Sequence, residues 1–285
     1  MNATAKILAG TTTPELSDQD LNYFSEVIER RAGIALKPAK RDLIRTRLRS
    51  RIAALSFASY EEYRHHLASL PKDDPEWQEF TNLLTTNKTD FFREAKHFEF
   101  MVQTILPQWL KTNAQTFNVW SAASSTGEEA YTLAMLLDRH LPAGRSFKIL
   151  ATDIDTEVVA TAKNSVYAIA KKPEIPVEFH STCLDFGKGD ARGWFRMKPH
   201  LREKIQFRQH NLIESTAPGE AVFDLVLCRN VLIYFNPENI DFVQKKIFRT
   251  VKPGGYFFIG HSESLQGFKH QWNPLGPSIF GKPGA

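Results

Sequence analysis

The sequence predicts an α/β protein with a helical N-terminal region and, after it, a parallel sheet wrapped by helices. Three observations support this fold class. Apolar residues recur with a helical period through the first third of the chain, and period-2 alternation of useful length is absent before residue 115. After that point, short β-rich runs alternate with helical segments. Such alternation is typical of a sheet with helices on its faces.

The N-terminal region is expected to contain four helices. Ser17 precedes Asp20 by three residues, a spacing typical of a helix start, and Gly33 suits the C-terminal cap of the same helix. A second, basic helix is expected over residues 38–54. Its apolar stripe consists of Ile44, Leu48, Ile52 and Leu55.

A capping box and two prolines predict the bounds of the third and fourth helices. Ser59 and Glu62 have the spacing of a capping box, which predicts a helix through Leu67. The segment 71–75 begins and ends with proline, which interrupts the helical pattern. Another helical stretch is expected over residues 76–84.

The later two thirds are expected to form five strands and three helices. The β-rich runs are 117–120, 147–152, 205–209, 223–228 and 256–260, and the helical patterns cover about 127–140, 155–164 and 236–250. Asn236 and Pro237 supply an N-cap and a first-turn proline for the last helix. Residues 251–255 are expected to form a tight turn into the fifth strand. Residues 165–204 show neither the strand periodicity nor the helix periodicity, and we interpret them as an inserted hairpin subdomain.

Composition and cysteine content exclude several classes of protein. The chain has 285 residues, of which 42% are hydrophobic and 24% charged, so it is long enough for two globular domains. Its apolar stretches fall short of the ~18 residues of a membrane span, and its polar start lacks a signal-peptide pattern. We therefore expect a cytoplasmic protein without membrane insertion. Cys183 and Cys228 lack companions at metal spacing, so neither a disulfide framework nor a metal site is expected.

Small and polar residues follow the predicted strands. In an open α/β sheet the ligand lies at the carboxyl ends of the strands. The first strand is followed by the small-residue loop 121–127, which allows a ligand to approach the backbone closely. Asp153 ends the second strand, where a carboxylate can accept hydrogen bonds from the two hydroxyls of a ribose, whereas Asp155 is expected to cap the next helix. Asn211 and Leu212 follow the third run and suit the edge and face of an adenine. Together these residues predict a nucleotide-type site.

Five motifs carry a resemblance to a known family. They are LLTTNKTDFFRE at 83–94, WSAASSTGEEAY at 120–131, ATDID at 151–155, CRNVLIYF at 228–235 and GHSE at 260–263. In this order, over residues 17–281, the sequence resembles the chemotaxis receptor methyltransferases, the CheR family. One departure is Ala130, where the family usually has proline after paired glutamates. This difference is expected to alter the rigidity of the helix start and to leave the chemistry unchanged.

The resemblance implies a Rossmann-like S-adenosylmethionine-dependent methyltransferase domain. It would cover residues 87–285, with an inserted β-subdomain at 165–204, and would follow a helical domain at 15–86. The implied reaction transfers methyl groups from S-adenosylmethionine to glutamate side chains of chemoreceptors, giving methyl esters and S-adenosylhomocysteine in chemotaxis adaptation. The cofactor contacts carried over are Asn87, Thr89, Arg93, Glu129, Asp153, Asn211, Leu212, Arg229 and Asn230.

The implied chemistry depends on positioning. The sulfonium makes the methyl group electrophilic, and a glutamate carboxylate is ionised at neutral pH, so a strong base is unnecessary. Orientation of two reactants can contribute up to ~7–11 kcal/mol. We expect Arg93 to orient a carboxylate through a two-pronged contact and Tyr234 to lie beside the transferring methyl group. These two residues are the predicted catalytic residues.

Basic residues are concentrated in the second helix. Seven basic residues and one acid, Asp42, lie between positions 37 and 51, which gives this segment a net charge of +6. The whole chain has +4, so the remainder has −2. A charge of this size can attract an acidic partner, although a solvated helix face is the ordinary alternative. The arginines expected to bind the substrate protein are Arg41, Arg45, Arg47, Arg49 and Arg51.

The sequence disfavours other partners and functions relative to the receptor. Nucleic-acid amino-methyltransferases typically have Pro-Pro and an aromatic residue after the fourth strand, whereas this chain has Arg229, Asn230 and Val231 there. We therefore expect no nucleic-acid partner. A module that senses S-adenosylmethionine without catalysis is a further alternative, disfavoured by Arg93, Asn230 and Tyr234. We expect a monomer that acts on the cytoplasmic domains of chemoreceptors. Whether the insertion binds a receptor tail peptide stays open.

Overall fold

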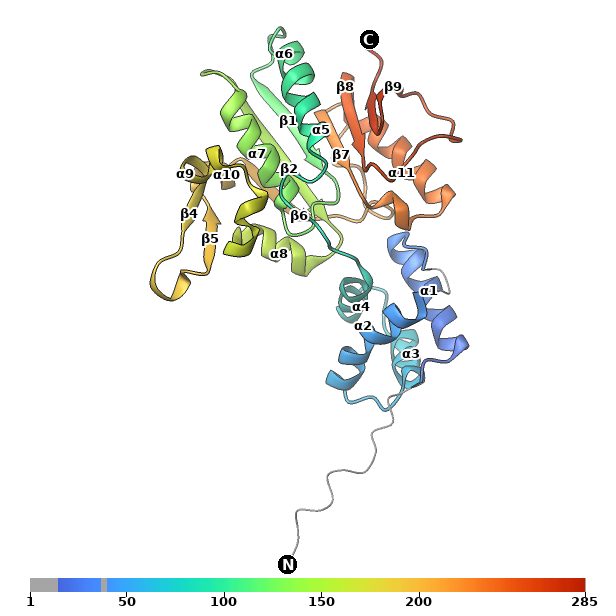
Figure 1. Ribbon diagram of the computed structural model, residues 1–285. Coiled ribbons are helices and arrows are strands. Elements are labelled where there is room, and N and C mark those ends of the chain that lie inside the picture. Colours follow the sequence, from blue (N-terminus) through green and yellow to red (C-terminus); the bar gives the residue numbers. More distant parts are fainter. Residues whose placement is uncertain (1–14, 37–39, 285) are drawn as a thin grey trace, which may run out of the picture.

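The computed structural model describes residues 15–36 and 40–284 (Figure 1). Four helices form the N-terminal unit, and it lies at one end of the sheet. Their bounds are α1 Asp18–Ala32, α2 Arg41–Ala54, α3 Tyr60–Ser69 and α4 Glu76–Leu84. The predicted start of the basic helix at residue 38 lies outside the described residues. Among the described residues, a helix long and apolar enough to cross a membrane is absent.

The caps of the N-terminal helices explain where they begin. The Ser17 hydroxyl accepts a hydrogen bond from the Asp20 backbone N–H, and Gly33 ends α1 with a φ of +75°. Such a φ favours glycine because residues with a Cβ atom are strained there. Ser59 caps α3 by accepting from the Glu62 N–H. The sequence-based expectation for these helices is confirmed.

The central sheet has seven strands in the order β6-β2-β1-β7-β8-β10-β9. Strands β6, β2, β1, β7 and β8 are parallel to one another, as predicted. Strands β10 and β9 add antiparallel pairs at one edge and were not predicted. The bounds are β1 Thr116–Ser121, β2 Ser146–Asp153, β6 Ile205–Gln209, β7 Phe223–Cys228, β8 Val251–Ile259, β9 Asn273–Gly276 and β10 Ile279–Gly281.

Helices follow the strands as the sequence indicated, and short helices α9 His180–Cys183 and α10 Pro199–Arg202 lie in the inserted region. The expected helices are α7 Glu128–His140, α8 Thr156–Asn164 and α11 Pro237–Thr250. Asp155 caps α8 by accepting from the N–H groups of Glu157 and Val158, and Asn236 caps α11. A further helical stretch precedes β1: α5 Ala95–Phe100, a π-helical turn at Met101–Ile105, and α6 Leu106–Trp109.

The expected turn at residues 251–255 is wrong in one respect, because strand β8 already begins at Val251. The pairing with β7 shifts register between Phe223 and Leu225, which lie opposite Val251 and Tyr256. The residues between them therefore form a bulge inside the strand. Gly254, with a φ of +74°, provides its sharp bend.

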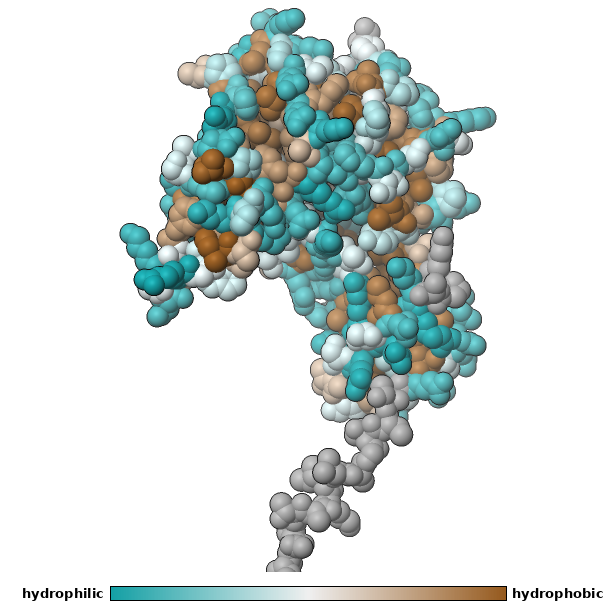
Figure 2. Space-filling model, in the orientation of Figure 1, coloured by the Kyte–Doolittle hydropathy of each residue, from teal (hydrophilic) through white to brown (hydrophobic). Residues whose placement is uncertain are grey.

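Residues 165–204 contain a small antiparallel sheet that projects from the side of the molecule (Figure 1). Its strands are β3 Val166–Ala168, β4 Leu184–Phe186 and β5 Trp194–Met197, in the order β3-β5-β4. A 3₁₀ turn at Ile169–Glu174 follows β3. Apolar side chains reach the surface in this region, among them Val177, Phe186 and Trp194 (Figure 2).

Alternate residues of each central strand point into two different cores. Val119, Leu225 and Phe258 pack with α5–α7 and the inserted subdomain. Trp120, Val226 and Phe257 pack on the other face with α11 and the N-terminal helices. The sheet is therefore covered on both sides, which agrees with the nearly continuous apolar sequence of β7.

Several contacts join the helical unit to the sheet region, among them a backbone bridge and side-chain hydrogen bonds. Ile34 and Phe235 form an antiparallel bridge, and the Ala35 N–H donates to the Tyr234 carbonyl oxygen at 2.7 Å. Asn82 of α4 donates to the Thr156 hydroxyl at 2.9 Å, at the start of α8. These contacts bring the chain between α1 and α2 next to the segment that follows β7.

A buried ion pair holds the helical unit together internally. The Arg51 guanidinium of α2 donates to both carboxylate oxygens of Glu76, and the Tyr63 hydroxyl donates to the same carboxylate at 2.7 Å. Glu76 is 7% exposed. Burial alone raises the pKa of the Glu76 carboxyl, but the bonds from Arg51 and Tyr63 lower it to a greater extent.

Replacing Arg51 with alanine is expected to lower the free energy of unfolding by about 3 kcal/mol, because the Glu76 carboxylate then stays buried without its counter-charge. Denaturant unfolding measures this effect, and Arg49→Ala on the exposed face of α2 is the control. The contribution of Arg51 is present above the ordinary glutamate pKa of 4.5 and is lost as the pH falls through the lowered folded-state value. Equal stability of both variants at neutral pH would contradict this assignment.

Candidate functional site

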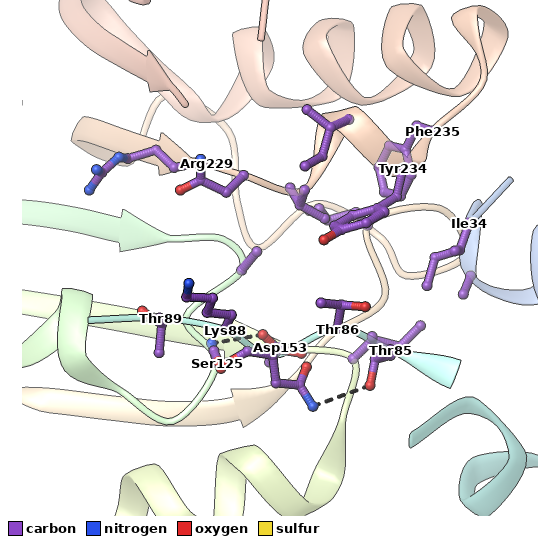
Figure 3. A pocket seen from close by; sticks show the side chains of 18 of the residues that line it. Ile34, Thr85, Thr86, Lys88, Thr89, Ser125, Asp153, Arg229, Tyr234 and Phe235 are labelled. Carbon is purple, nitrogen blue, oxygen red and sulfur yellow. Dashed lines mark hydrogen bonds between the residues drawn. The ribbon is translucent and has the colours of Figure 1, made fainter. Parts of the chain in front are cut away.

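A pocket of about 500 Å³ lies between the helical unit and the carboxyl ends of β1, β2 and β7. Figure 3 shows Arg229, Tyr234 and Phe235 on one side of it and, on the other, Thr85, Thr86, Lys88, Thr89, Ser125 and Asp153. All ten residues predicted to hold the cofactor or to act in catalysis line this pocket. They are Asn87, Thr89, Arg93, Glu129, Asp153, Asn211, Leu212, Arg229, Asn230 and Tyr234.

Asp153 lies at the end of β2 and is buried. Its two carboxylate oxygens accept hydrogen bonds from the backbone N–H groups of Ser125, at 2.8 Å, and Asp155, at 3.1 Å. Burial raises the pKa of the Asp153 carboxyl to about 6, because these two bonds only partly compensate for the loss of water. A carboxylate held in this way can still accept further hydrogen bonds from a ligand.

The segment from Thr85 to Glu94 crosses the pocket without regular secondary structure, so other parts of the chain must hold it in place. The Asn87 side chain donates to Asp155 at 2.7 Å, and the Asn87 carbonyl accepts from the Ser125 hydroxyl at 2.8 Å. The Phe92 N–H donates to the Thr132 hydroxyl at 3.1 Å. Asn87 therefore contributes to the anchoring of the segment as well as to the pocket wall.

Arg229 and Glu94 form a buried ion pair at the end of this segment. The Arg229 side chain is 3% exposed and lies 3.0 Å from carboxylate oxygens of both Glu94 and Glu129. It also donates to the Arg93 carbonyl oxygen. Burial alone raises the pKa of Glu94, but the positive charge of Arg229 and hydrogen bonds from Asn230 and His261 lower it to about 2. Glu94 is thus ionised at any physiological pH.

Asn230 is held from both sides. Its side chain donates to Glu94 at 3.1 Å, and its backbone N–H donates to Glu263 at 3.0 Å. The φ values of Asn230 and Glu94 are +58° and +59°, in a region that residues with a Cβ atom rarely adopt. Backbone strain of this kind persists only where the surrounding contacts determine the conformation, and it is common at functional sites.

Arg93 and Tyr234 both line the pocket. The Arg93 guanidinium donates to the Lys88 carbonyl oxygen at 3.0 Å, which leaves most of its N–H groups for other partners. Tyr234 belongs to a 3₁₀ turn at Leu232–Tyr234, and Figure 3 shows its ring directed into the open space. Both side chains are half-buried.

Asn211 and Leu212 line the adenine end predicted from the sequence, but the Asn211 side chain is already engaged. Its amide donates to the Arg31 carbonyl oxygen, and its side-chain oxygen accepts from the Ile213 N–H at 2.9 Å. Leu212 is buried and presents an apolar surface. His210 also lines this end, and burial lowers its pKa to about 4.

The five arginines of α2 have different surroundings. Arg41 pairs with Asp18, and Arg51 pairs with Glu76. Arg47 reaches the pocket, where it donates to the Thr85 carbonyl oxygen. Arg45 lies beside Asp42 of its own helix and, like Arg49, is exposed. Of the five arginines predicted to bind the substrate protein, Arg47 therefore lines the pocket, whereas Arg45 and Arg49 are exposed on the surface.

Glu94, His97 and His261 form a compact group beside Arg229, with possible ligand atoms within 4.8 Å of one another. His97 is fully buried, and burial together with the charge of Arg229 lowers its pKa to about 4. The Glu94 oxygen nearest to the His97 Nδ1 already accepts from Arg229. A guanidinium at this position disfavours a second cation.

Several contributing residues were not assigned a role from the sequence. Glu94 and Glu263 stand inside two of the motifs, which is the signal that could have found them. Ser125 lies in the small-residue loop and has a φ of +47°. The partners of these side chains are 28 to 136 positions away in the sequence, so only the fold reveals them.

Comparison with known proteins agrees with this geometry. Residues 19–85 match the all-alpha domain of the CheR methyltransferases, and residues 87–278 match their SAM binding domain. The chain is 34% identical to the chemotaxis protein methyltransferase of Salmonella typhimurium, over 97% of this chain and 94% of that protein. It is also 34% identical to the chemotaxis protein methyltransferase of Escherichia coli, over 97% and 95%, and to chemotaxis protein methyltransferase 2 of Pseudomonas aeruginosa, over 95% and 98%. The chain therefore belongs to the CheR family and is a chemotaxis protein methyltransferase that uses S-adenosylmethionine as methyl donor.

Proposed function

We propose that this protein methylates glutamate side chains of chemoreceptors, and that the ten residues gathered around one pocket hold the donor and align the acceptor. This gathering is the observation that carries the proposal. Eight of the residues come from four of the motifs, and Asn211 and Leu212 follow β6; the carboxyl edge of the sheet and the segment that crosses it bring them together. The product is a glutamate methyl ester, as expected for chemotaxis adaptation.

The pocket fits S-adenosylmethionine in size and polarity. A volume of about 500 Å³ is within the range of pockets that bind molecules of this size. Asp153 provides a buried acceptor for ribose hydroxyls, and Leu212 provides an apolar surface for the adenine. Glu129 provides a carboxylate for the donor's amino group, while Asn87 and Thr89 form the opposite wall. When bound, the donor supplies an electrophilic methyl group on its sulfonium.

Arg229 and Asn230 are proposed to act mainly by positioning. The N–H groups of Arg229 are directed at Glu94, Glu129 and the Arg93 carbonyl oxygen, so its charge stabilises the arrangement of these groups. The Asn230 amide is likewise bonded to Glu94. These bonds fix the two sides of the pocket relative to each other, as catalysis by alignment requires.

Arg93 and Tyr234 are the proposed catalytic residues. The free N–H groups of Arg93 can bind a carboxylate in a bidentate manner. Tyr234 directs its ring into the same pocket. A carboxylate between them needs no proton transfer, because glutamate is ionised at neutral pH.

The basic helix α2 is proposed to attract the receptor. Arg45 and Arg49 are exposed and carry the charge that an acidic surface would meet first, and Arg47 connects this surface to the pocket. We further propose that the protein acts as a cytoplasmic monomer, with a helical domain at 15–86 and a methyltransferase domain at 87–285.

Replacing Arg93 with alanine is expected to reduce kcat by about 100-fold or more, because the acceptor loses its orienting group. The measurement is transfer of radiolabelled methyl groups to receptor-containing membranes, with base-released methanol as the readout. Lys96→Ala is the matched control, since Lys96 is an exposed basic residue three positions away. Near-normal turnover by Arg93→Ala would refute this role.

Reversing the charges of Arg45 and Arg49 to glutamate is expected to raise the KM for receptor and to leave the KM for the donor unchanged. The effect should diminish at high salt, because exposed charges are screened. The double variant Lys111→Glu/Lys163→Glu makes the same charge change at exposed positions away from α2 and serves as control. Equal effects of the two double variants would show that only net charge matters.

Binding of S-adenosylmethionine is expected to weaken as the pH falls through about 6, where Asp153 takes up a proton. The raised pKa means that the carboxyl is protonated below this pH and then accepts hydrogen bonds poorly. Calorimetric titration on either side of pH 6 measures the change without the receptor. An Asp153→Asn variant should bind weakly at all these pH values, and an equally steep pH dependence in that variant would exclude Asp153 as its source.

A further inference from the structure

We propose that Lys171 and Glu174, in the 3₁₀ turn at the start of the inserted subdomain, are positioning residues for the catalytic segment Thr89–Arg93. This inference rests on the proposed roles of Thr89 and Arg93. It assigns to the subdomain a part in methyl transfer that is separate from any contact with the receptor.

Lys171 connects three parts of the chain. Its ammonium donates to the Thr89 carbonyl oxygen at 3.1 Å and lies 2.8 Å from a carboxylate oxygen of Glu128. The Glu128 side chain is 1% exposed, so this charge requires a partner. Glu128 begins α7, which places the ammonium between the helix start and the catalytic segment.

Glu174 holds the same segment two residues further on. Its carboxylate accepts from the Phe91 backbone N–H at 2.9 Å. The Phe91 ring packs edge-on against Tyr167 of β3 at a centroid distance of 5.0 Å and also contacts Phe195 of β5. The subdomain thus binds the segment through two polar bonds and one aromatic cluster.

The segment depends on such outside contacts. It lacks regular secondary structure, and Phe92 has a φ of +54°. Without partners for the Thr89 carbonyl and the Phe91 N–H, Phe92 would relax toward an ordinary backbone conformation. Arg93 follows Phe91 by two positions, so relaxation would displace its guanidinium from its position in the pocket.

The first test compares Glu174→Ala with Glu174→Gln. A glutamine oxygen can still accept from the Phe91 N–H, whereas alanine removes the acceptor. Glu174→Ala is expected to lower kcat about tenfold or more, as small misplacements of reacting groups do, with an unchanged KM for receptor. Glu174→Gln should restore most of the activity. A purely structural role would lower thermal stability and leave kcat of the folded enzyme unchanged, which would overturn the proposal.

The second test avoids leaving Glu128 unpaired. The double variant Lys171→Met/Glu128→Gln removes the bond to Thr89 together with the buried charge, and it is compared with Glu128→Gln alone. The double variant should lose donor affinity and kcat relative to that reference. Lys172→Met is the neighbouring control, because Lys172 stacks on Phe186 within the subdomain. Equal activity of the double and single variants would overturn the role of Lys171.

The proposed function and this inference fail in different ways. If the wild-type protein transfers no methyl groups to receptor glutamates, the proposed function is wrong. If the wild type is active and Glu174→Ala and the Lys171 double variant are equally active, only the positioning role is wrong.

Discussion

The arrangement of the chain segments around the pocket depends on one buried guanidinium, that of Arg229. Arg229 follows directly after β7, and its charge must be compensated because the side chain is almost completely removed from water. Glu129 of α7 and Glu94, which directly follows the catalytic segment, supply the compensation. Three parts of the chain that are distant in sequence are therefore held at fixed positions by one group. The unusual backbone conformations of Glu94 and Asn230 are consequences of this arrangement.

Much of the fold could be predicted from local signals. Ser17, Ser59, Asp155 and Asn236 all act as the N-caps that their spacing indicated. Strands β9 and β10 were not predicted, because they are short and contain proline and glycine, and they are strands only through their pairing with β8. The helical stretch before β1 was not predicted either, although its buried residues Phe98, Met101, Ile105 and Trp109 recur at helical spacing.

The site was predictable as a set of residues but not as a set of contacts. Residues that end strands are near one another by topology, so the sequence located Asp153, Asn211 and Arg229 in one pocket. It could not show that Arg51 is paired with Glu76 or that Arg41 is paired with Asp18, because these partners come from other helices. The net charge of the segment 37–51 therefore overestimates the unpaired positive charge that a binding partner can contact. Of the +6 segment, Arg45 and Arg49 are the arginines exposed at the surface.

The shared core on the far face of the sheet limits how the molecule can move. Apolar residues of α1–α4 form one continuous cluster with Trp120, Val226 and Phe257 of the central strands. Swinging the helices away as a rigid lid would expose this cluster to water, at a cost that grows with the apolar area uncovered. Exchange of the donor for its product must then proceed through small local movements at the pocket mouth. A molecule built in this way would release its product without separating its two halves, and it would fold and unfold as one cooperative unit.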